Sequence, residues 1–390
     1  MKNHSSRRDF LSVGLALPVA GIASSLGVCT ESEQPAAKLS PVSSAKLSYR
    51  TLGRTGLKVT TVGFGCMLTS DPSVIERGAD LGINYFDTAR VYQQGNNERM
   101  VGVGLKRKRR EIFLSTKTDA TTTQGALDDL DTSLRELGTD YLDIWYLHAK
   151  SKPEDVTGEL IEAQQRAKQQ GKVRFIGVST HAPKELIPWL VKKGATDVVL
   201  AIYNFTADQG VDPVLAEASK AGMGLVAMKV MAGGFRKVKP GDPLYPKLKR
   251  QGALLAALKW AVKNPHVHTT VPSMTDMDQL DENLRAMAEL YTPGEEKLLA
   301  QHLEYITPFY CRTCGKCEGT CAKSLPVADM LRFLTYADGY GQFALGRGRF
   351  QELPAEVSAV RCQDCSRCTV SCPFGVRVPS QLSRAQELFA

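Results

Sequence analysis

Short apolar runs alternate with longer amphipathic runs along most of this sequence, and that alternation constrains the fold more than any other feature. Eight runs have the length of buried strands: residues 62–67, 83–86, 112–116, 141–147, 173–179, 198–203, 224–230 and 268–272. Helical patterns follow them, several ending in glycine as helix C-termini prefer. Eight such units predict a closed α/β barrel, the (β/α)8 or TIM-barrel fold. An open doubly wound sheet is the alternative, but Leu68 stands where its Gly-x-Gly-x-x-Gly motif has the third glycine.

Polar residues stand at the carboxyl ends of the second, third and fourth predicted strands. Asp87, Lys117 and His148 directly follow these strands, and Tyr92 lies in the loop after Asp87. The carboxyl ends of barrel strands meet on one face, where such enzymes place their chemistry. A phenol beside an ammonium, a carboxylate and an imidazole can protonate a carbonyl oxygen, and we expect the Lys cation to favour the phenolate. Each residue alone also has a structural explanation, such as a buried salt bridge or a satisfied histidine.

The four residues resemble the tetrad of the aldo-keto reductase superfamily, which has Asp, Tyr, Lys and His in this order. The resemblance covers residues 47–290. It also includes the segments Phe86-Asp87-Thr88-Ala89 and Asn97-Glu98. It implies a barrel that interconverts a carbonyl and an alcohol with a nicotinamide cofactor. Tyr92 is then the general acid or base, Asp87 holds Lys117, and His148 orients the substrate or relays the proton.

The resemblance also assigns contacts to the cofactor, and here the sequence partly departs from the family pattern. Ser179 and Thr180 correspond to the Ser-Asn pair that holds the nicotinamide amide, and Leu200 stands where the family has a Gln. Glu282 and Asn283 match the pair that holds the adenine. The resemblance therefore implies NAD(P)H binding with an altered amide site.

The two positions that usually bind the 2′-phosphate of NADPH carry no cation. Ser273 and Gln279 stand where the family has Lys and Arg. A 2′-phosphate favours charge-assisted hydrogen bonds from such cations, so the sequence argues against selective NADPH binding. The alternatives are that NADH is used, or that a nearby cation such as Lys229 or Arg285 substitutes.

Eight of the ten cysteines form two C-x2-C-x2-C-x3-C motifs near the end of the chain. They are Cys311, Cys314, Cys317 and Cys321, followed by Cys362, Cys365, Cys368 and Cys372. In bacterial two-cluster ferredoxins, three thiolates of such a motif hold one [4Fe–4S] cube and the fourth holds the other cube. We therefore predict two [4Fe–4S] clusters in a small ferredoxin-like domain. Structural zinc and disulfides are the alternatives, although such short, repeated intervals make poor disulfide bridges.

The first residues have the pattern of a targeting segment. Ser6-Arg7-Arg8-Asp9-Phe10-Leu11 precedes an apolar run at residues 13–28 and resembles a twin-arginine export signal. This predicts a periplasmic or otherwise extracytoplasmic protein that contacts the membrane only through its signal. The pathway exports folded proteins, which suits a chain that acquires a metal cofactor first. A membrane anchor is the alternative, and lipidation at Cys29 is disfavoured because Val28 precedes it.

The formal net charge of +8 does not indicate nucleic-acid binding. Much of it comes from the run at residues 106–110, which we interpret as the solvated end of a helix. No aromatic-studded basic surface accompanies that run.

Together these patterns divide the chain into a signal and linker (1–46), a reductase barrel (47–300) and an iron–sulfur domain (301–390). The leading hypothesis is an exported oxidoreductase that acts on a small carbonyl or alcohol substrate, with clusters that exchange electrons with a redox partner protein. One physical objection is that nicotinamide transfers two electrons as hydride, whereas a [4Fe–4S] cube carries one. The second hypothesis is an iron–sulfur electron-transfer or binding protein that uses no nicotinamide and retains the barrel as a scaffold.

Overall fold

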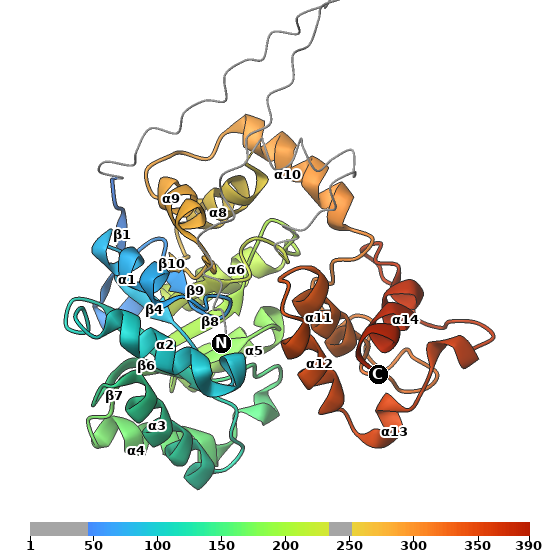
Figure 1. Ribbon diagram of the computed structural model, residues 1–390, viewed down its shortest axis with the longest axis horizontal. Coiled ribbons are helices and arrows are strands. Elements are labelled where there is room, and N and C mark those ends of the chain that lie inside the picture. The colour runs from blue at the N-terminus through green and yellow to red at the C-terminus, as the bar shows by residue number, and fades with distance from the viewer. Residues whose placement is uncertain (1–45, 234–251) are drawn as a thin grey trace, which may run out of the picture. The chain divides into compact units, whose positions relative to one another are not determined.

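Eight parallel strands form one sheet in the computed structural model, which describes residues 46–233 and 252–390 (Figure 1). The strands are β3 (Phe64–Gly65), β4 (Tyr85–Asp87), β5 (Phe113–Thr118), β6 (Leu142–Leu147), β7 (Val173–Thr180), β8 (Val198–Ile202), β9 (Gly224–Met228) and β10 (Thr269–Thr270). They pair in sequence order, and the bridges Val62–Thr270 and Gly65–Ser273 join the first strand to the last. The predicted (β/α)8 barrel is therefore confirmed.

The barrel strands are apolar because both of their faces are covered. Every residue of β6 and β8 is buried, as expected where helices pack outside a parallel sheet and side chains fill its interior. Two buried tyrosines inside the barrel satisfy each other, since the Tyr85 and Tyr146 hydroxyls lie 2.8 Å apart. The polar residues at the strand ends thus rise from a packed interior.

The surrounding helices begin and end where the sequence supplies caps. They are α1 (Pro72–Asp80), α2 (Asn96–Leu105), α3 (Thr123–Leu137), α4 (Gly158–Gln169), α5 (Pro183–Lys193), α6 (Val211–Lys220), α8 (Ala253–Lys263) and α9 (Met277–Arg285). The Asp71 side chain accepts the N–H of Ser73 at the start of α1, and Thr122 caps α3 in the same way. Gly138 ends α3 in the left-handed conformation that glycine adopts without strain.

A hairpin precedes the barrel and closes the end opposite to the strands' carboxyl termini. It consists of β1 (Tyr49–Thr51) and β2 (Lys58–Thr60), and Leu52 belongs to the apolar cluster inside the barrel. Gly53 is required at the turn: its φ is +49°, and an added Cβ would lie 2.5 Å from the carbonyl oxygen of Gly222.

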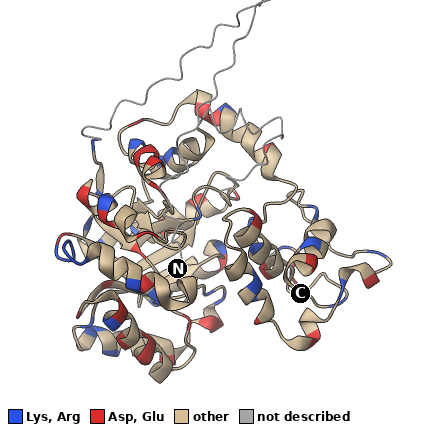
Figure 2. Ribbon diagram, viewed as in Figure 1, with Lys and Arg blue, Asp and Glu red and all other residues tan. Residues whose placement is uncertain are grey.

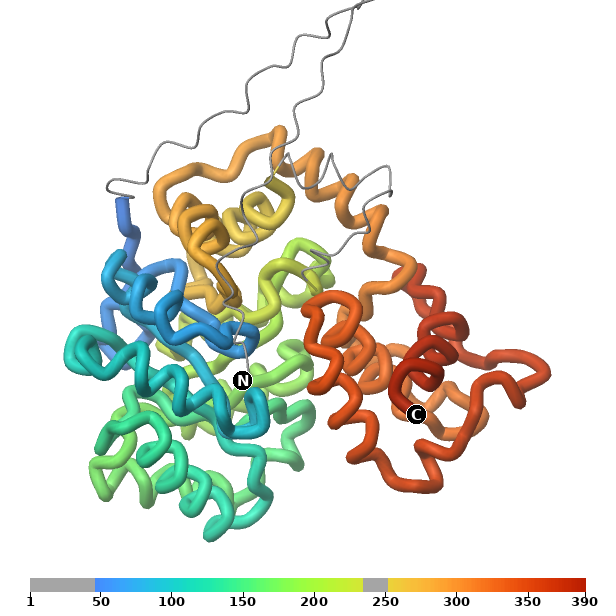
Figure 3. Tube along the Cα trace, viewed as in Figure 1, coloured from blue at the N-terminus to red at the C-terminus, as the bar shows by residue number. Residues whose placement is uncertain are grey.

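The last ninety residues form a helical unit with an apolar core of its own. Helix α10 (Pro293–Ile306) leads into it (Figure 3). Its helices are α11 (Val327–Asp338), α12 (Phe343–Gln351), α13 (Ala355–Ser358) and α14 (Val378–Phe389). Met330, Phe350 and Phe389 belong to its core. Residues 301–390 contain no strand, so a ferredoxin-like fold is not confirmed, and the domain boundary at residue 300, which falls within α10, remains a prediction.

Acidic and basic side chains are interspersed over the helices (Figure 2). Within the basic run at residues 106–110, Arg109 differs from the predicted solvated helix end. Its guanidinium lies 3.0 Å from Asp143 and 4.0 Å above the Tyr141 ring, because the chain folds back toward β6 after α2 ends at Leu105. None of the helices in the two described ranges is both long and apolar enough to cross a membrane. The predicted signal segment, including Cys29, lies outside the described residues.

Candidate active site

The structure brings the four predicted tetrad residues together at the carboxyl ends of the strands. Asp87 ends β4 and Lys117 lies in β5; Lys117 Nζ is 2.6 Å from Asp87 Oδ2 and also donates to the Thr88 carbonyl at 2.6 Å. The same Nζ lies 4.9 Å from the centre of the Tyr92 ring. The Tyr92 and His148 rings meet edge to face, with centroids 5.8 Å apart. A phenol, an ammonium, a carboxylate and an imidazole therefore share one site.

The pKa of Tyr92 is set mainly by its burial. Burial raises the pKa of the phenol well above its usual value, and the charge of Asp87 adds to this effect. Burial and the charge of Asp87 both disfavour the phenolate in the resting site, so acidification of Tyr92 by Lys117 stays a prediction. Tyr92 stays protonated at neutral pH, which is the form that donates a proton to a carbonyl oxygen.

His148 is held by residues that the sequence analysis did not identify. Its Nδ1 lies 2.6 Å from Asp119 Oδ1, without the alignment of a hydrogen bond, and Asp119 Oδ2 lies 3.0 Å from the guanidinium of Arg349 in α12. Burial lowers the pKa of His148, although Asp119 acts in the opposite direction. Burial alone would raise the pKa of Asp119, but His148 and Arg349 hold it below its usual value. We conclude that the imidazole is neutral near pH 7 and faces a carboxylate.

Backbone strain is concentrated around the site. Several residues other than glycine adopt left-handed conformations beside Tyr92, His148 and the end of β9. They are Gln93, Gln94, Ala149, Lys229 and Ala232, with φ between 46° and 57°. The Gln93 side chain holds the turn in place, since its amide donates to the backbone carbonyls of Met67 and Thr69. Such strain persists only where the surroundings over-determine it, which is common at functional sites.

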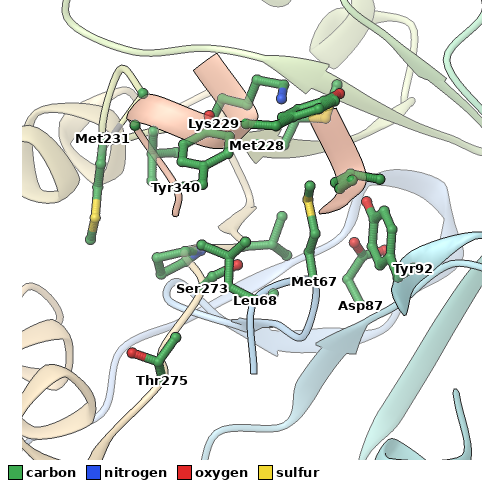
Figure 4. Close-up of a pocket in the computed structure, with 18 of the residues that line it drawn as sticks. Met67, Leu68, Asp87, Tyr92, Met228, Lys229, Met231, Ser273, Thr275 and Tyr340 are labelled. Carbon is green, nitrogen blue, oxygen red and sulfur yellow. The ribbon is translucent and has the colours of Figure 1, made fainter. Parts of the chain in front are cut away.

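A cavity of about 330 Å3 opens beside the tetrad (Figure 4). Met67, Met228 and other apolar residues form most of its wall, and Asp87, Tyr92 and His148 lie in the wall as well. The helical C-terminal unit supplies part of the remainder. Its contributions are Tyr336, Gly339, Tyr340, Leu345 and Arg349. The cavity is therefore lined by residues of both the barrel and the helical C-terminal unit.

The predicted contacts to the nicotinamide amide lie away from this cavity. Ser179 and Thr180 are buried in β7, and their hydroxyls accept the N–H groups of Ala149 at 2.7 Å and Ala182 at 2.9 Å. Neither residue lines the cavity, although each hydroxyl keeps its own proton for donation. Leu200 is buried in the barrel interior.

The predicted adenine and phosphate positions give a mixed result. Asn283 is buried, and neither its amide oxygen nor its nitrogen has a hydrogen-bond partner within the described structure. A buried unpartnered amide fits a site for a polar ligand, and the partly buried Glu282 is adjacent. Ser273 and Gln279 line the cavity without supplying charge. Their roles toward a cofactor remain predictions.

The two cations proposed as substitutes at the phosphate site differ in position. Lys229 lines the cavity, whereas Arg285 is exposed on α9 and lies 2.6 Å from Glu289. Only Lys229 could therefore act within the cavity as it stands.

The eight C-terminal thiols fall into two sets. Burial raises the pKa of Cys311 to about 12, and the charges of Cys317, Cys314 and Cys372 add to the effect. Burial also raises the pKa of Cys362, with contributions from Cys321, Cys365 and Cys368. Each set thus combines three cysteines of one motif with the fourth of the other. All eight are free thiols in the structure.

Further contacts distinguish the set that contains Cys311. Its four cysteines line one small cavity, and the N–H groups of Thr313 and Phe374 approach the sulfurs of Cys311 and Cys372 at 3.3 and 3.4 Å. Hydrogen bonds from the backbone to sulfur tune iron–sulfur clusters. No group of His, Cys, Asp or Glu in the described part of the chain has the spacing of a single-ion metal site, but a cube spreads its four ligands more widely.

The barrel and its four-residue site define the class of protein, a (β/α)8-barrel oxidoreductase. The profile of the Aldo/keto reductase family matches residues 71–304, and the chain therefore belongs to this family. Enzymes of the family use NAD(P)H and act on small carbonyl or alcohol substrates. Residues 305–390, with all eight clustered cysteines, lie outside the match.

Individual relatives align with about two thirds of the chain. It is 27% identical over 295 residues to the uncharacterized oxidoreductase YqkF of Bacillus subtilis, covering 65% of this chain and 95% of that protein. It is 27% identical over 303 residues to L-galactose dehydrogenase of Arabidopsis thaliana, covering 67% and 94%. The holo form of aldo-keto reductase AKR11C1 from Bacillus halodurans superimposes with a TM-score of 0.56 at 28% identity, covering 65% of this chain and 96% of that structure.

Proposed function

We propose that this chain is an exported aldo-keto reductase that interconverts a small carbonyl compound and its alcohol with a nicotinamide cofactor and carries two [4Fe–4S] clusters. The observation that carries the reductase assignment is the convergence of Tyr92, Lys117, Asp87 and His148 beside one cavity. Bound nicotinamide supplies or accepts the hydride. The other roles belong to the chain's own residues.

Tyr92 is the proton donor during reduction, because burial keeps its hydroxyl protonated. Lys117, fixed by Asp87, holds a positive charge 4.9 Å from the centre of the Tyr92 ring, where it would stabilise the phenolate as that forms. His148 is neutral, and its ring lies edge to face with that of Tyr92, where it would orient the substrate oxygen. The apolar wall excludes water, which strengthens these interactions.

The clusters are supported by the grouping of the thiols. One cube is assigned to Cys311, Cys314, Cys317 and Cys372, and the other to Cys321, Cys362, Cys365 and Cys368. Iron would bind these cysteines as thiolates and would remove the proton even from Cys311, Cys317 and Cys362, whose pKa values burial otherwise raises. The clusters would exchange single electrons with a redox partner protein. Twin-arginine export rests on the sequence pattern around Arg7 and Arg8.

A second function is an iron–sulfur protein whose barrel binds no dinucleotide. Two observations favour it. The Ser179 and Thr180 hydroxyls already accept N–H groups from the loops after β6 and β7, and Ser273 and Gln279 carry no charge. An intact tetrad favours the reductase.

The two functions separate in one preparation. The full chain is purified anaerobically, iron and sulfide are counted, and the protein is titrated with NADH and NADPH while nicotinamide fluorescence is followed. The reductase predicts about eight irons per chain and saturable binding of at least one dinucleotide. If neither NADH nor NADPH binds at millimolar concentration, the second function, an iron–sulfur protein with a barrel that binds no dinucleotide, is supported instead.

A further inference from the structure

Lys229 is a cation in the cavity wall without a carboxylate partner among the described residues. It follows the end of β9 in a left-handed conformation, with φ of +55°. Its Nζ lies 5.0 Å from the ring centre of Tyr336 and 5.3 Å from that of Tyr340, both on or just after α11. Burial lowers the pKa of this amine, and the nearby Arg332 adds to the effect. Contacts with aromatic faces compensate only part of the cost of removing an ammonium from water.

His181 provides an independent sign of a missing partner in the same cavity. It lines the cavity wall, is 8% exposed, and its Nδ1 has no hydrogen-bond partner within the described ranges. Burial holds the pKa of the ring well below its usual value, and the charge of Lys229 contributes, so the imidazole is neutral. Buried polar atoms are normally satisfied, so an unpaired ring nitrogen in the same cavity wall as an ammonium without a carboxylate indicates a polar ligand.

The charges around the cavity favour an anion over a neutral ligand. Its cations are Lys229 and Arg349, while the carboxylate of Asp87 in its wall is already bound to Lys117. Arg349 is engaged by Asp119 and Glu352, which leaves Lys229 as the uncompensated charge. Figure 4 shows Lys229 and Tyr340 on one side of the cavity, and Met67 and Tyr92 on the other.

We propose that Lys229 and His181 form an oxyanion subsite in this cavity, so that the substrates include carbonyl compounds that carry a carboxylate. This inference rests on the proposed function, because it assigns a substrate class to the same site. The carboxylate binds Lys229, and the carbonyl is directed toward Tyr92 across the cavity. A phosphate of the dinucleotide offers the same chemistry, and the experiment separates the two sources.

The test compares 3- and 4-carboxybenzaldehyde with their methyl esters, which have the same ring and aldehyde but no charge. Reduction is measured with NADH and NADPH for the wild type, Lys229→Met and Lys229→Arg. Binding of the acids and of each dinucleotide is measured separately by calorimetry. The matched control is Lys263→Met, since Lys263 also lies over an aromatic ring, 4.8 Å from the centre of Tyr291, but does not line the cavity.

For a substrate carboxylate we expect Lys229→Met to raise KM and Kd of at least one acid about 10- to 100-fold, as for loss of a charge-assisted hydrogen bond. The esters and dinucleotides should change less than about twofold, and Lys229→Arg should restore most of the acid binding. If the dinucleotides weaken instead, with the acid-to-ester ratio unchanged, the subsite binds phosphate.

The subsite is overturned if neither acids nor dinucleotides are affected, or if Lys263→Met has the same effect. Failure of the proposed function gives a different result. The wild type then reduces neither the carboxybenzaldehydes nor their methyl esters. Calorimetry still shows whether binding of the carboxybenzaldehydes depends on Lys229. His181→Gln, with a weaker effect in the same direction, provides a second reading if Lys229→Met does not fold.

Discussion

The barrel rim and the C-terminal cysteine unit hold reactive groups in different ways. At the rim, the charges satisfy one another: Lys117 donates to Asp87 and to a backbone carbonyl, and both residues are buried. In the cysteine unit, the thiols gather in two sets; burial raises the pKa of Cys311 and Cys317, and neighbouring cysteines add to this effect. The Lys117–Asp87 pair therefore needs no further partner, whereas the proposed iron would stabilise the cysteine sets as thiolates.

The contrast suggests that the two regions depend on different conditions. The rim rests on a barrel with a large apolar core, and its geometry follows from strand order. The cysteine unit has a smaller core that includes Cys317 itself. We expect the barrel to fold without iron, and the cysteine unit to depend on it.

Tyr92→Phe should have the largest effect, because it should abolish chemistry at the barrel rim and leave the cysteine unit unchanged. We expect kcat/KM for carbonyl reduction to fall about 10^2- to 10^4-fold because the proton donor is lost, while the iron content stays the same. Steady-state kinetics and iron counting on one preparation test this. Tyr49→Phe, on the exposed β1 strand, is the control. A loss of less than about fivefold would remove Tyr92 from the chemistry.

Cys321→Ala and Cys362→Ala test the grouping of the thiols. Although the two residues lie in different motifs, we expect both variants to lose the same cluster and to keep about four of about eight irons. Cys372→Ala should remove the other cluster. Electron paramagnetic resonance of the reduced proteins distinguishes the clusters. If Cys321→Ala and Cys311→Ala instead share a phenotype, each motif holds its own cube.

His302 on α10, which leads from the barrel to the cysteine unit, gives a pH-dependent contribution to stability. Burial lowers its pKa to about 4, and neither ring nitrogen has a hydrogen-bond partner in the described structure. As the pH falls below about 6.5 the unfolded chain takes up a proton that the folded chain refuses, so stability falls. We expect a loss of about 2 kcal/mol between pH 7 and pH 5 from this group.

Denaturant unfolding of wild type and His302→Leu measures that loss, with His266→Gln as the control. The leucine variant should lose less stability over the same interval. Identical pH profiles in wild type and His302→Leu would contradict the assignment.

Ser273→Lys introduces a cation at the cavity wall and tests which residue determines the preference between NADH and NADPH. The new ammonium can bind a 2′-phosphate, so we expect NADPH affinity to rise about tenfold with NADH nearly unchanged. Fluorescence titration with both dinucleotides measures it, and Thr275→Lys on the same wall is the matched comparison. An equal change for both dinucleotides would place the phosphate elsewhere.

Arg349→Gln has the smallest expected effect and tests whether the two regions cooperate. Arg349 reaches from α12 to Asp119, which contacts His148, so it is a positioning residue. Its charge lowers the pKa of His148, and removing it should shift the acid limb of the kcat/KM profile upward by roughly half a pH unit. We expect Arg349→Lys to keep the profile. A lower rate with an unchanged profile would indicate a purely structural role.

Much of the barrel could be predicted because its signals are local. The apolar runs mark the eight strands, and Asp87, Lys117 and His148 stand at strand ends whose convergence follows from the fold. Asp119 and His181 also follow strand ends, and the same signal could have identified them.

The rest of the site depends on contacts between distant segments. Tyr336 and Arg349 approach the tetrad only because the C-terminal unit packs near the cavity, and no pattern in the sequence specifies that contact. The raised pKa of Tyr92 could not be predicted for a similar reason, since it depends on burial and on the nearby charge of Asp87. The grouping of Cys321 with Cys362, in contrast, agrees with the motif spacing.

The most direct test of the central claim follows the hydrogen atoms during reduction. The wild type is incubated with methyl 4-formylbenzoate and NADH carrying deuterium at the transferable C4 position, and the product is analysed by mass spectrometry and NMR. A reductase of this kind places one deuterium on the carbinol carbon and takes the hydroxyl proton from solvent, and the transfer should nearly vanish in Tyr92→Phe. Product without deuterium, or equal transfer in the variant, would contradict carbonyl chemistry at Tyr92.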